Sequence, residues 1–149
     1  MSYSTKRGVF PPNKPNPSPV IELLIDRQPW GRRGASHFSF GNRTCRMLLA
    51  CKNVLEHFLE TEGATPEQHT KTVQGNEWFP VQISVKGFSN FEMQPNGITI
   101  NRPYLEFSCS QAPNIGIGLQ KAEGLLAVWN QLEAFANDVG MPPIGRPAN

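Results

Sequence analysis

Apolar residues recur with two different periods along the chain, and the change of period marks the predicted elements. Residues 20–26 (VIELLID) form a nearly continuous apolar run, and residues 36–41 (SHFSFG) alternate so that both phenylalanines share one face. Both patterns are typical of β-strands. From residue 44 to residue 62 the apolar positions instead recur every three or four residues, which predicts an amphipathic helix. Gly63 follows the last turn and is expected to end this helix.

The second half of the chain shows the same order with more strands. Strand patterns are predicted at residues 78–88, 90–102, 103–109 and 114–119. A Pro-Asn-Gly sequence at residues 95–97 predicts a hairpin turn within the second of these. The polar residues 64–77 are expected to form a connector, and residues 120–139 a final helix. The buried face of that helix is predicted to contain Leu125, Val128, Trp129, Leu132, Phe135, Ala136 and Val139.

An internal repeat relates the two predicted helices. LLACKNVLEHF (residues 48–58) and LLAVWNQLEAF (residues 125–135) are identical at seven of eleven positions, at an offset of 77, where random matching would give roughly one identity. The same offset aligns the preceding strands: Phe38, Phe40 and Gly41 fall on Ile115, Ile117 and Gly118. Two unrelated amphipathic helices would share leucines by composition, but this alternative does not explain the matched Asn, Glu and Gly residues. A duplicated unit is therefore predicted.

The repeat predicts an α+β fold in which two antiparallel sheet-then-helix units, at residues 19–63 and 78–140, form one pseudo-symmetric domain. The two units differ in length. PVIEL (residues 19–23) resembles PYLEF (residues 103–107) at an offset of 84, so the first unit carries seven extra residues in its hairpin loop. The first unit also shows two candidate strands against four or five in the second, unless the GVF sequence at residues 8–10 supplies another.

Irregular tails are predicted on both sides of this single domain, which covers residues 19–140. Residues 1–18 are expected to form a flexible arm, because residues 11–19 hold five prolines in nine positions and proline favours extended conformations over helix. Residues 141–149 are rich in proline and glycine and are expected to form a C-terminal tail.

Composition and cysteine usage indicate a soluble, intracellular protein. No apolar run approaches the length of a membrane span, and the N-terminus has no apolar signal-peptide segment. Cys45, Cys51 and Cys109 are odd in number and lack the spacing of a disulfide scaffold, which favours buried thiols in a reducing compartment. The sequence has no Cys-x-x-Cys motif and no histidine spacing typical of a metal site, so no metal is expected.

Catalytic motifs are also missing from the sequence. It contains no nucleophile elbow, no phosphate loop and no paired His-carboxylate motif, and GIGLQKAEG (residues 116–124) does not match a dinucleotide fingerprint. We therefore expect a protein that is not an enzyme and that holds no cofactor.

Charge is distributed unevenly along the chain. The net charge is +2, but residues 1–54 carry +7 and residues 55–149 carry −5. This asymmetry permits an anion-binding surface, provided that the fold does not interleave the two halves.

The sequence RQPWGRRG, at residues 27–34, places three arginines and a tryptophan at the tip of the first predicted hairpin. Proteins that bind single-stranded nucleic acid without sequence preference combine cationic side chains with aromatic faces on which bases stack. The candidate nucleic-acid-binding residues are Arg27, Trp30, Arg32 and Arg33 in this loop, Arg43 and Arg46 after the next strand, Lys14 on the arm, and Lys86, Phe88 and Phe91 in the second half. As an alternative, Trp30 covers its own sheet and the arginines around it are solvated.

The remaining aromatic residues are predicted in two groups. Phe38 and Phe40 are expected in the core, because they share the face that packs against the helix. A second set divides between the two faces of its strands without a clear assignment: Phe88, Phe91, Tyr104 and Phe107.

A repeated antiparallel sheet followed by a helix resembles the Whirly and Pur-type single-stranded nucleic-acid-binding proteins. The resemblance covers residues 19–139 and rests on the architecture and the internal repeat. The Lys-Gly-Lys-Ala-Ala-Leu stretch of plant Whirly proteins is absent, so no family residue is assigned by motif. The resemblance implies that the helices of the two units pack together, that the sheets face outward, and that nucleic acid lies on the sheets.

We therefore expect a protein that binds single-stranded DNA or RNA, with DNA favoured and with little sequence specificity. The alternative is a non-enzymatic, oligomeric structural, assembly or regulatory protein, such as a small viral one. Both interpretations predict a homo-oligomer, because sheet edges and paired helices favour self-association. Neither predicts a membrane partner.

Overall fold

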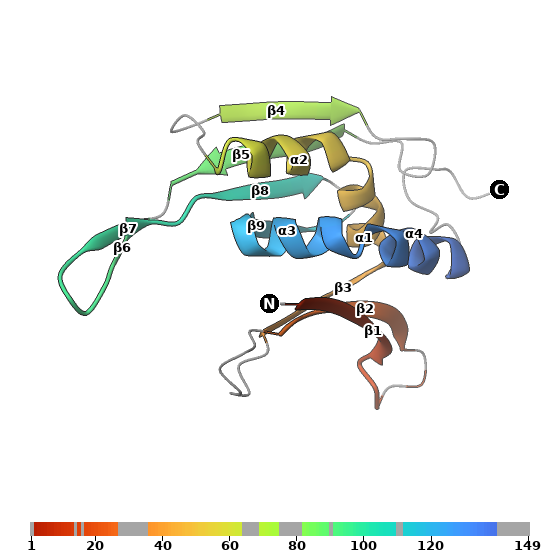
Figure 1. Cartoon of the computed structure of the whole chain (residues 1–149). Helices are drawn as coiled ribbons and strands as arrows, with labels where there is room; N and C mark the ends of the chain where they lie inside the picture. The colour runs from red at the N-terminus through yellow and green to blue at the C-terminus, as the bar shows by residue number, and fades with distance from the viewer. Residues whose placement is uncertain are drawn as a thin grey trace.

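A computed structural model describes residues 2–13, 15, 17–26, 36–63, 69–74, 82–89, 91–109 and 112–139 of the chain. Within these ranges the chain forms four helices, two larger antiparallel sheets and a separate two-stranded hairpin. This arrangement, shown in Figure 1, confirms the predicted α+β class. The predicted C-terminal tail at 141–149 lies outside the described residues.

Three strands form the first sheet, in the order β1-β2-β3: β1 (Ser2–Phe10), β2 (Ser18–Asp26) and β3 (Ser36–Gly41). All neighbours in this sheet are antiparallel. Successive side chains of β2 alternate between its faces, so Ile21, Leu23 and Ile25 are buried. Phe40 on β3 is also buried, and Phe38 packs half-buried beside it, which confirms their predicted place in the core.

Strand β1 corrects the prediction that residues 1–18 form a flexible arm. All nine residues of β1 pair with β2. Polar contacts with the helices also hold the strand, and these contacts could not be predicted from the sequence. The Tyr3 hydroxyl donates a hydrogen bond to Glu123 Oε1 at 2.7 Å, and Arg7 Nη1 lies 2.8 Å from Asp138 Oδ2. The folded part of the chain therefore includes β1 and does not begin at residue 19.

Four strands form the second sheet, in the order β4-β5-β8-β9: β4 (His69–Gln74), β5 (Gln82–Phe88), β8 (Tyr104–Cys109) and β9 (Ala112–Gly118). Strands β5, β8 and β9 lie within or close to the predicted segments. Strand β4 lies inside residues 64–77, which were expected to form a connector, so that expectation was wrong. Among the described residues β4 pairs with β5 alone, at the edge of the sheet. An edge strand can be polar in sequence.

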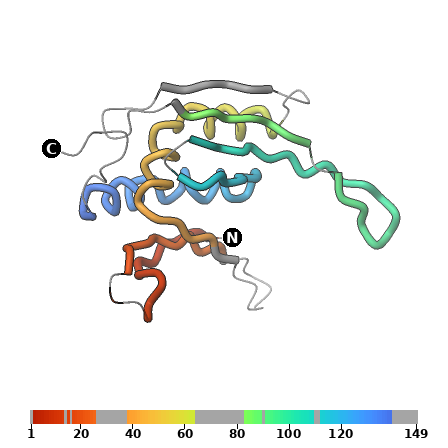
Figure 2. The backbone as a smooth tube through the Cα atoms, turned by 180° about the vertical axis from the view of Figure 1, so that it is seen from behind, coloured from red at the N-terminus to blue at the C-terminus, as the bar shows by residue number. Residues whose placement is uncertain are grey.

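A hairpin of two short strands, β6 (Phe91–Met93) and β7 (Thr99–Asn101), connects β5 to β8. Its turn is closed by a hydrogen bond of 2.8 Å from the Gln94 amide to the Ile98 carbonyl. Gly97 has a φ of 86°, a left-handed conformation that glycine adopts without steric cost. These features confirm the hairpin predicted from Pro-Asn-Gly. Figures 1 and 2 show that it extends away from the rest of the molecule.

Each of the two predicted helices is interrupted once. The first divides into α1 (Asn42–Leu49) and α2 (Lys52–Glu60), and the second into α3 (Leu119–Ala127) and α4 (Trp129–Asp138). The interruptions lie at Cys51 (φ −118°, ψ 29°) and Val128 (φ −110°, ψ 21°), which are separated by the repeat offset of 77. Gly41 and Gly118, which precede α1 and α3 in nearly the same extended conformation, follow the same offset. These matches support the interpretation of a duplicated unit, and the pseudo-symmetric arrangement itself stays a prediction.

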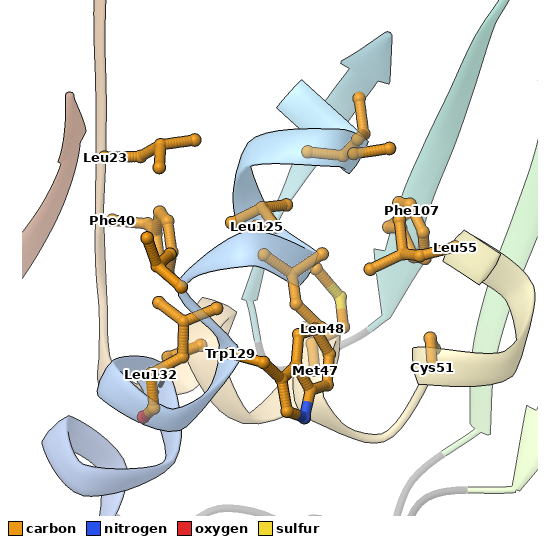
Figure 3. Close-up of a cluster of buried hydrophobic side chains, with 14 of the residues drawn as sticks. Leu23, Phe40, Met47, Leu48, Cys51, Leu55, Phe107, Leu125, Trp129 and Leu132 are labelled. Atoms are coloured by element: carbon orange, nitrogen blue, oxygen red, sulfur yellow. Dashed lines mark hydrogen bonds between the residues drawn. The ribbon is translucent and has the colours of Figure 1, made fainter. Parts of the chain in front are cut away.

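The helices cover one face of the second sheet, and the first sheet contacts α1 and α3 (Figure 1). Helix α1 contacts α4, and α2 contacts α3 (Figures 1 and 2). Figure 3 shows the shared core, in which Leu23 and Phe40 of the first sheet and Phe107 of the second lie on either side of Leu125 and Met47. The predicted buried face of the last helix is confirmed: every member is buried except Val139, which packs half-buried against the core.

Gly124 determines how closely the first sheet approaches α3. A Cβ atom at this position would lie 2.8 Å from Cδ1 of Tyr3 and 3.1 Å from Cδ2 of Leu23. Glycine is unfavourable inside a helix by about 1 kcal/mol relative to alanine. Here it allows β1 and β2 to pack directly against the helix backbone.

Candidate nucleic-acid interface

The candidate interface lies on the face of the second sheet that points away from the helices. Side chains alternate between the two faces of a strand, and burial follows this alternation in β5 and β8. The helix-facing positions Ile83, Val85, Leu105 and Phe107 are all buried. The opposite positions, which we call the outer face, are Ser84, Lys86, Phe88, Tyr104, Glu106 and Ser108. This divides the aromatic residues that the sequence left unassigned.

Phe88 and Tyr104 form the aromatic centre of the outer face. They lie directly opposite each other in the antiparallel β5–β8 pair. Their ring centroids are 5.2 Å apart and their planes differ by 18°, so the rings are stacked. Residues opposite each other on neighbouring strands project to the same face, and the strand register is therefore sufficient to bring these rings together.

Strand β9, the neighbour of β8 on the side opposite β5, carries two glycines close to Tyr104. Gly118 pairs with Tyr104, and Gly116 pairs with Glu106. A Cβ atom at Gly116 would lie 3.6 Å from Cδ2 of Tyr104. Glycine at such positions leaves the backbone open to close approach. One edge of the Tyr104 ring therefore lies close to main chain and not to another side chain.

Charges near this face are arranged in opposite pairs. Lys86, which is exposed, lies opposite Glu106 in the strand register. At the base of the hairpin, Arg102 Nε donates a hydrogen bond of 3.0 Å to Glu92 Oε1. Hydrogen bonds from Gln94 and Arg102 lower the pKa of Glu92, so its carboxylate stays ionised. The outer face thus offers modest attraction for a polyanion, and its aromatic surface is the more distinctive feature.

Phe91 is a further exposed aromatic residue, on the hairpin that follows β5. It is 68% exposed and begins β6, three residues after Phe88. Lys86, Phe88 and Phe91 therefore lie along one stretch of chain that leaves the outer face and enters the hairpin (Figure 1). The structure adds Tyr104, which could have been found from the sequence only with the correct register between β5 and β8.

The candidates in the first half of the chain are only partly placed. Five of them lie outside the described residues: Lys14, Arg27, Trp30, Arg32 and Arg33. Arg43 is exposed in the first turn of α1, as a ligand-binding side chain must be.

Arg46 is not available to a ligand, and its assignment to the interface was wrong. The side chain is 2% exposed, and its Nη2 donates a hydrogen bond of 2.6 Å to the Ala136 carbonyl in the last turn of α4. A cation is favourable at that place because the last carbonyls of a helix carry partial negative charge. Burial lowers the pKa of the Arg46 guanidinium. This arginine joins α1 to α4 inside the molecule.

Other basic residues of the first half are also used in contacts within the chain. Arg7 pairs with Asp138, and Lys52 Nζ lies 5.6 Å from the centre of the Trp129 ring. Together with the Arg46 hydrogen bond, these contacts connect the positive first half to the negative second half. The fold therefore interleaves the two halves, and the charge asymmetry along the sequence does not by itself define an anion-binding surface.

The described part of the chain offers neither a metal-binding cluster nor a membrane-spanning helix. Among the described residues, no three or more His, Cys, Asp or Glu side chains are grouped so that they could hold a metal ion. All three cysteines are free thiols, and burial raises the pKa of Cys45 to about 12. No helix in the described ranges combines the length and the apolar character needed to cross a membrane.

No family model, no curated protein and no solved structure matches the chain. The resemblance to Whirly and Pur-type proteins therefore continues to rest on the order of elements and on the internal repeat.

Proposed function

We propose that the chain is a non-enzymatic protein that binds single-stranded nucleic acid, DNA in preference to RNA, on the outer face of its second sheet. One observation carries the proposal. The stacked Phe88–Tyr104 pair lies on the outer face beside glycine backbone, with Lys86 on the same face. Bases can stack there because every base has a π-face, which also explains why little sequence preference is expected.

Stacking provides most of the binding free energy in this proposal. Each base stacked on an aromatic side chain contributes about 1–3 kcal/mol. Lys86 and Arg43 contribute contacts to the phosphates, and the arginines of residues 27–34 add to them. Because Lys86 is opposite Glu106, the outer face alone would neutralise few phosphates, and the affinity should fall moderately rather than steeply with salt.

The experiment is fluorescence anisotropy with labelled single-stranded DNA, single-stranded RNA and duplex DNA at two salt concentrations. The wild-type chain is expected to bind the single strands, DNA more tightly, and to bind the duplex least. No binding of any oligonucleotide at low salt would refute the proposal.

Two matched variants locate the site. Phe88→Leu/Tyr104→Leu removes both rings but keeps apolar bulk, and is expected to weaken binding about 5- to 150-fold for each stacked base lost. The swapped variant Phe88→Tyr/Tyr104→Phe keeps both rings and should bind as the wild type does. Equal binding by both variants would exclude the outer face as the site.

The hairpin favours a second candidate function, that of an assembly or structural protein. Four of its apolar side chains are 41–73% exposed, which is typical of protein–protein contact surfaces: Phe91, Met93, Ile98 and Ile100. If assembly is the whole function, the anisotropy experiment gives no signal, whereas self-association remains.

A further inference from the structure

The hairpin, residues 91–101, is a ribbon without a partner in the described part of the chain. Strands β6 and β7 pair only with each other there. A two-stranded ribbon on its own is at best marginally stable in water. Its large apolar side chains are nevertheless exposed: Phe91 by 68%, Met93 by 73%, Ile98 by 60% and Ile100 by 41%. Contact with another molecule would both cover these side chains and stabilise the ribbon.

The two faces of the hairpin differ in chemistry. Ile100 pairs with Glu92, and Met93 pairs with Thr99. Because side chains alternate along a strand, Ile98 and Ile100 share one face with Glu92, while Phe91 and Met93 share the other. Isoleucine has no ring on which a base can stack. The Ile98–Ile100 face, with the Glu92–Arg102 ion pair at its base, therefore fits an apolar protein surface rather than nucleic acid.

The first sheet carries a surface that matches this face. A hollow of about 440 Å³ at the end of β1 is lined by Lys6, Val9, Phe10, Val20, Glu22 and Phe40, among others. Val9 is 48% exposed and Phe10 65%. Apart from the hairpin, these are the only large apolar side chains with such exposure among the described residues.

Charge is complementary between the two surfaces. In the hollow, Lys6 lies opposite Glu22 in the β1–β2 register. The hairpin face carries one carboxylate, Glu92, and one guanidinium, Arg102. In the docked pair, Glu92 lies toward Lys6, and Arg102 lies toward Glu22. Opposite charges then meet on both sides of the apolar contact and fix the orientation of the hairpin in the hollow.

We propose that the Ile98–Ile100 face of the hairpin docks into the Val9–Phe10 hollow of a second copy of this chain. The hairpin and the end of β1 lie on opposite sides of the molecule (Figure 1). Each copy therefore offers its hairpin to one neighbour and its hollow to another. Such head-to-tail contacts form a closed ring, or a filament where the rotation does not close.

The size of the contact favours closure. The four exposed apolar side chains of this contact, Val9, Phe10, Ile98 and Ile100, offer roughly 400 Å² in total, taking about 180 Å² for a fully exposed side chain. One contact is therefore smaller than the specific, stable interfaces of proteins, which begin at about 1,200 Å². A single pair of copies is therefore weakly bound, whereas in a ring every copy uses both surfaces. The expected association passes from monomer to ring with little dimer.

The test is sedimentation velocity over a range of concentrations with three variants. Ile98→Thr/Ile100→Thr changes the docking face of the hairpin, and Val9→Thr/Phe10→Thr changes the hollow. Phe91→Thr/Met93→Thr removes a similar apolar surface from the other face of the same hairpin and is the matched control. Circular dichroism confirms that each variant is folded.

The wild type and the control are expected to form the same oligomer, and the other two variants to sediment as monomers. Mixing these two variants leaves one intact hairpin and one intact hollow, so the mixture should form a 1:1 pair at high concentration and nothing larger. A monomeric wild type, loss of assembly in the control alone, or a mixture that does not associate would overturn the proposal. Fluorescence anisotropy with single-stranded DNA tests the Ile98→Thr/Ile100→Thr variant for nucleic-acid binding. That binding is expected to be retained when assembly is lost, because the outer face of the second sheet is unchanged.

Discussion

The two sheets are attached to the same helices by different kinds of contact. On the second sheet, the helix-facing side chains of β5, β8 and β9 that are buried are apolar: Ile83, Val85, Leu105, Phe107 and Ile117. On the first sheet, β2 and β3 are attached in this way, whereas β1 adds polar contacts to the packing of its Tyr3 ring against α3. Tyr3 bonds to Glu123, Thr5 to Gln131 and Arg7 to Asp138.

This difference predicts where the molecule is sensitive to its conditions. Apolar burial does not depend on the protonation of any group, and salt strengthens rather than screens it. Exposed ion pairs and hydrogen bonds contribute little each and respond to salt and pH. The second sheet should therefore determine global stability, and β1 should detach first. Three changes test this division.

The largest effect is expected from Phe107→Ala on the second sheet. Phe107 is fully buried in the shared core, beside Leu55 in Figure 3. Loss of a buried phenylalanine side chain costs about 3–5 kcal/mol, because transfer free energy is lost and a cavity remains. Urea denaturation followed by circular dichroism measures the free energy of unfolding. A cost below about 1 kcal/mol would show that the second sheet does not dominate stability.

An intermediate effect is expected from Gly124→Ala, which acts on the first sheet. The added methyl group would lie 2.8 Å from Cδ1 of Tyr3, so β1 must move or strain. Overpacking of this kind typically costs 1–3 kcal/mol, which outweighs the gain of up to about 1 kcal/mol from helix propensity.

The double variant Tyr3→Ala/Gly124→Ala provides the control, because removing the Tyr3 ring relieves the closest contacts of the methyl group and leaves only Cδ2 of Leu23, at 3.1 Å. In the Tyr3→Ala background, Gly124→Ala is expected to cost much less or to stabilise. The same cost in both backgrounds would mean that the approach of β1 is not what requires glycine. Hydrogen exchange of the β1 amides reports directly on whether the strand detaches.

The smallest effect is expected from Tyr3→Phe and appears in the pH dependence. Burial, and then the hydrogen bond and the negative charge of Glu123, raise the pKa of Tyr3 from 10.0 to about 12. The neutral phenol is thus favoured in the folded state, so its contribution is complete below pH 10 and is lost as the pH rises from 10 to 12. Near neutral pH, loss of the hydrogen bond should cost about 1 kcal/mol.

Stability measured between pH 8 and pH 12 should therefore fall less steeply in Tyr3→Phe than in the wild type. The raised pKa of Cys45 acts in the same direction in both proteins, so Cys45→Ala in each background isolates the contribution of Tyr3. Identical slopes in that background would contradict the role of this hydrogen bond.

Strong periodicity predicted the elements that contribute apolar side chains to the core. The alternation in residues 36–41 and the three- and four-residue spacing in residues 44–62 and 120–139 give the correct type of element. Strands β1 and β4 were not predicted, because SYSTKRGVF and HTKTVQ are mostly polar and lie at sheet edges. Backbone hydrogen bonds to the neighbouring strand hold β1 and β4 in place, and such bonds do not require a pattern of apolar side chains.

The candidate site was predictable to a similar extent. The sequence itself brings Lys86, Phe88 and Phe91 close together, since they lie two and three positions apart. Tyr104 depends on the β5–β8 register, which the sequence does not specify. Arg46 was misassigned because a charged residue beside an apolar stripe is usually solvated. Its burial depends on the Ala136 carbonyl, 90 residues away.

The crossed pairing of α1 with α4 and of α2 with α3 also constrains synthesis of the chain. Helices α1 and α2 leave the ribosome long before the helices that cover them, because α4 is the last element of the described chain. Met47, Leu48 and Leu55, all buried in the finished protein, remain uncovered during that interval. Chains that stall before α4 should therefore be substrates for chaperones and prone to aggregate, since the core closes only when the last helix arrives.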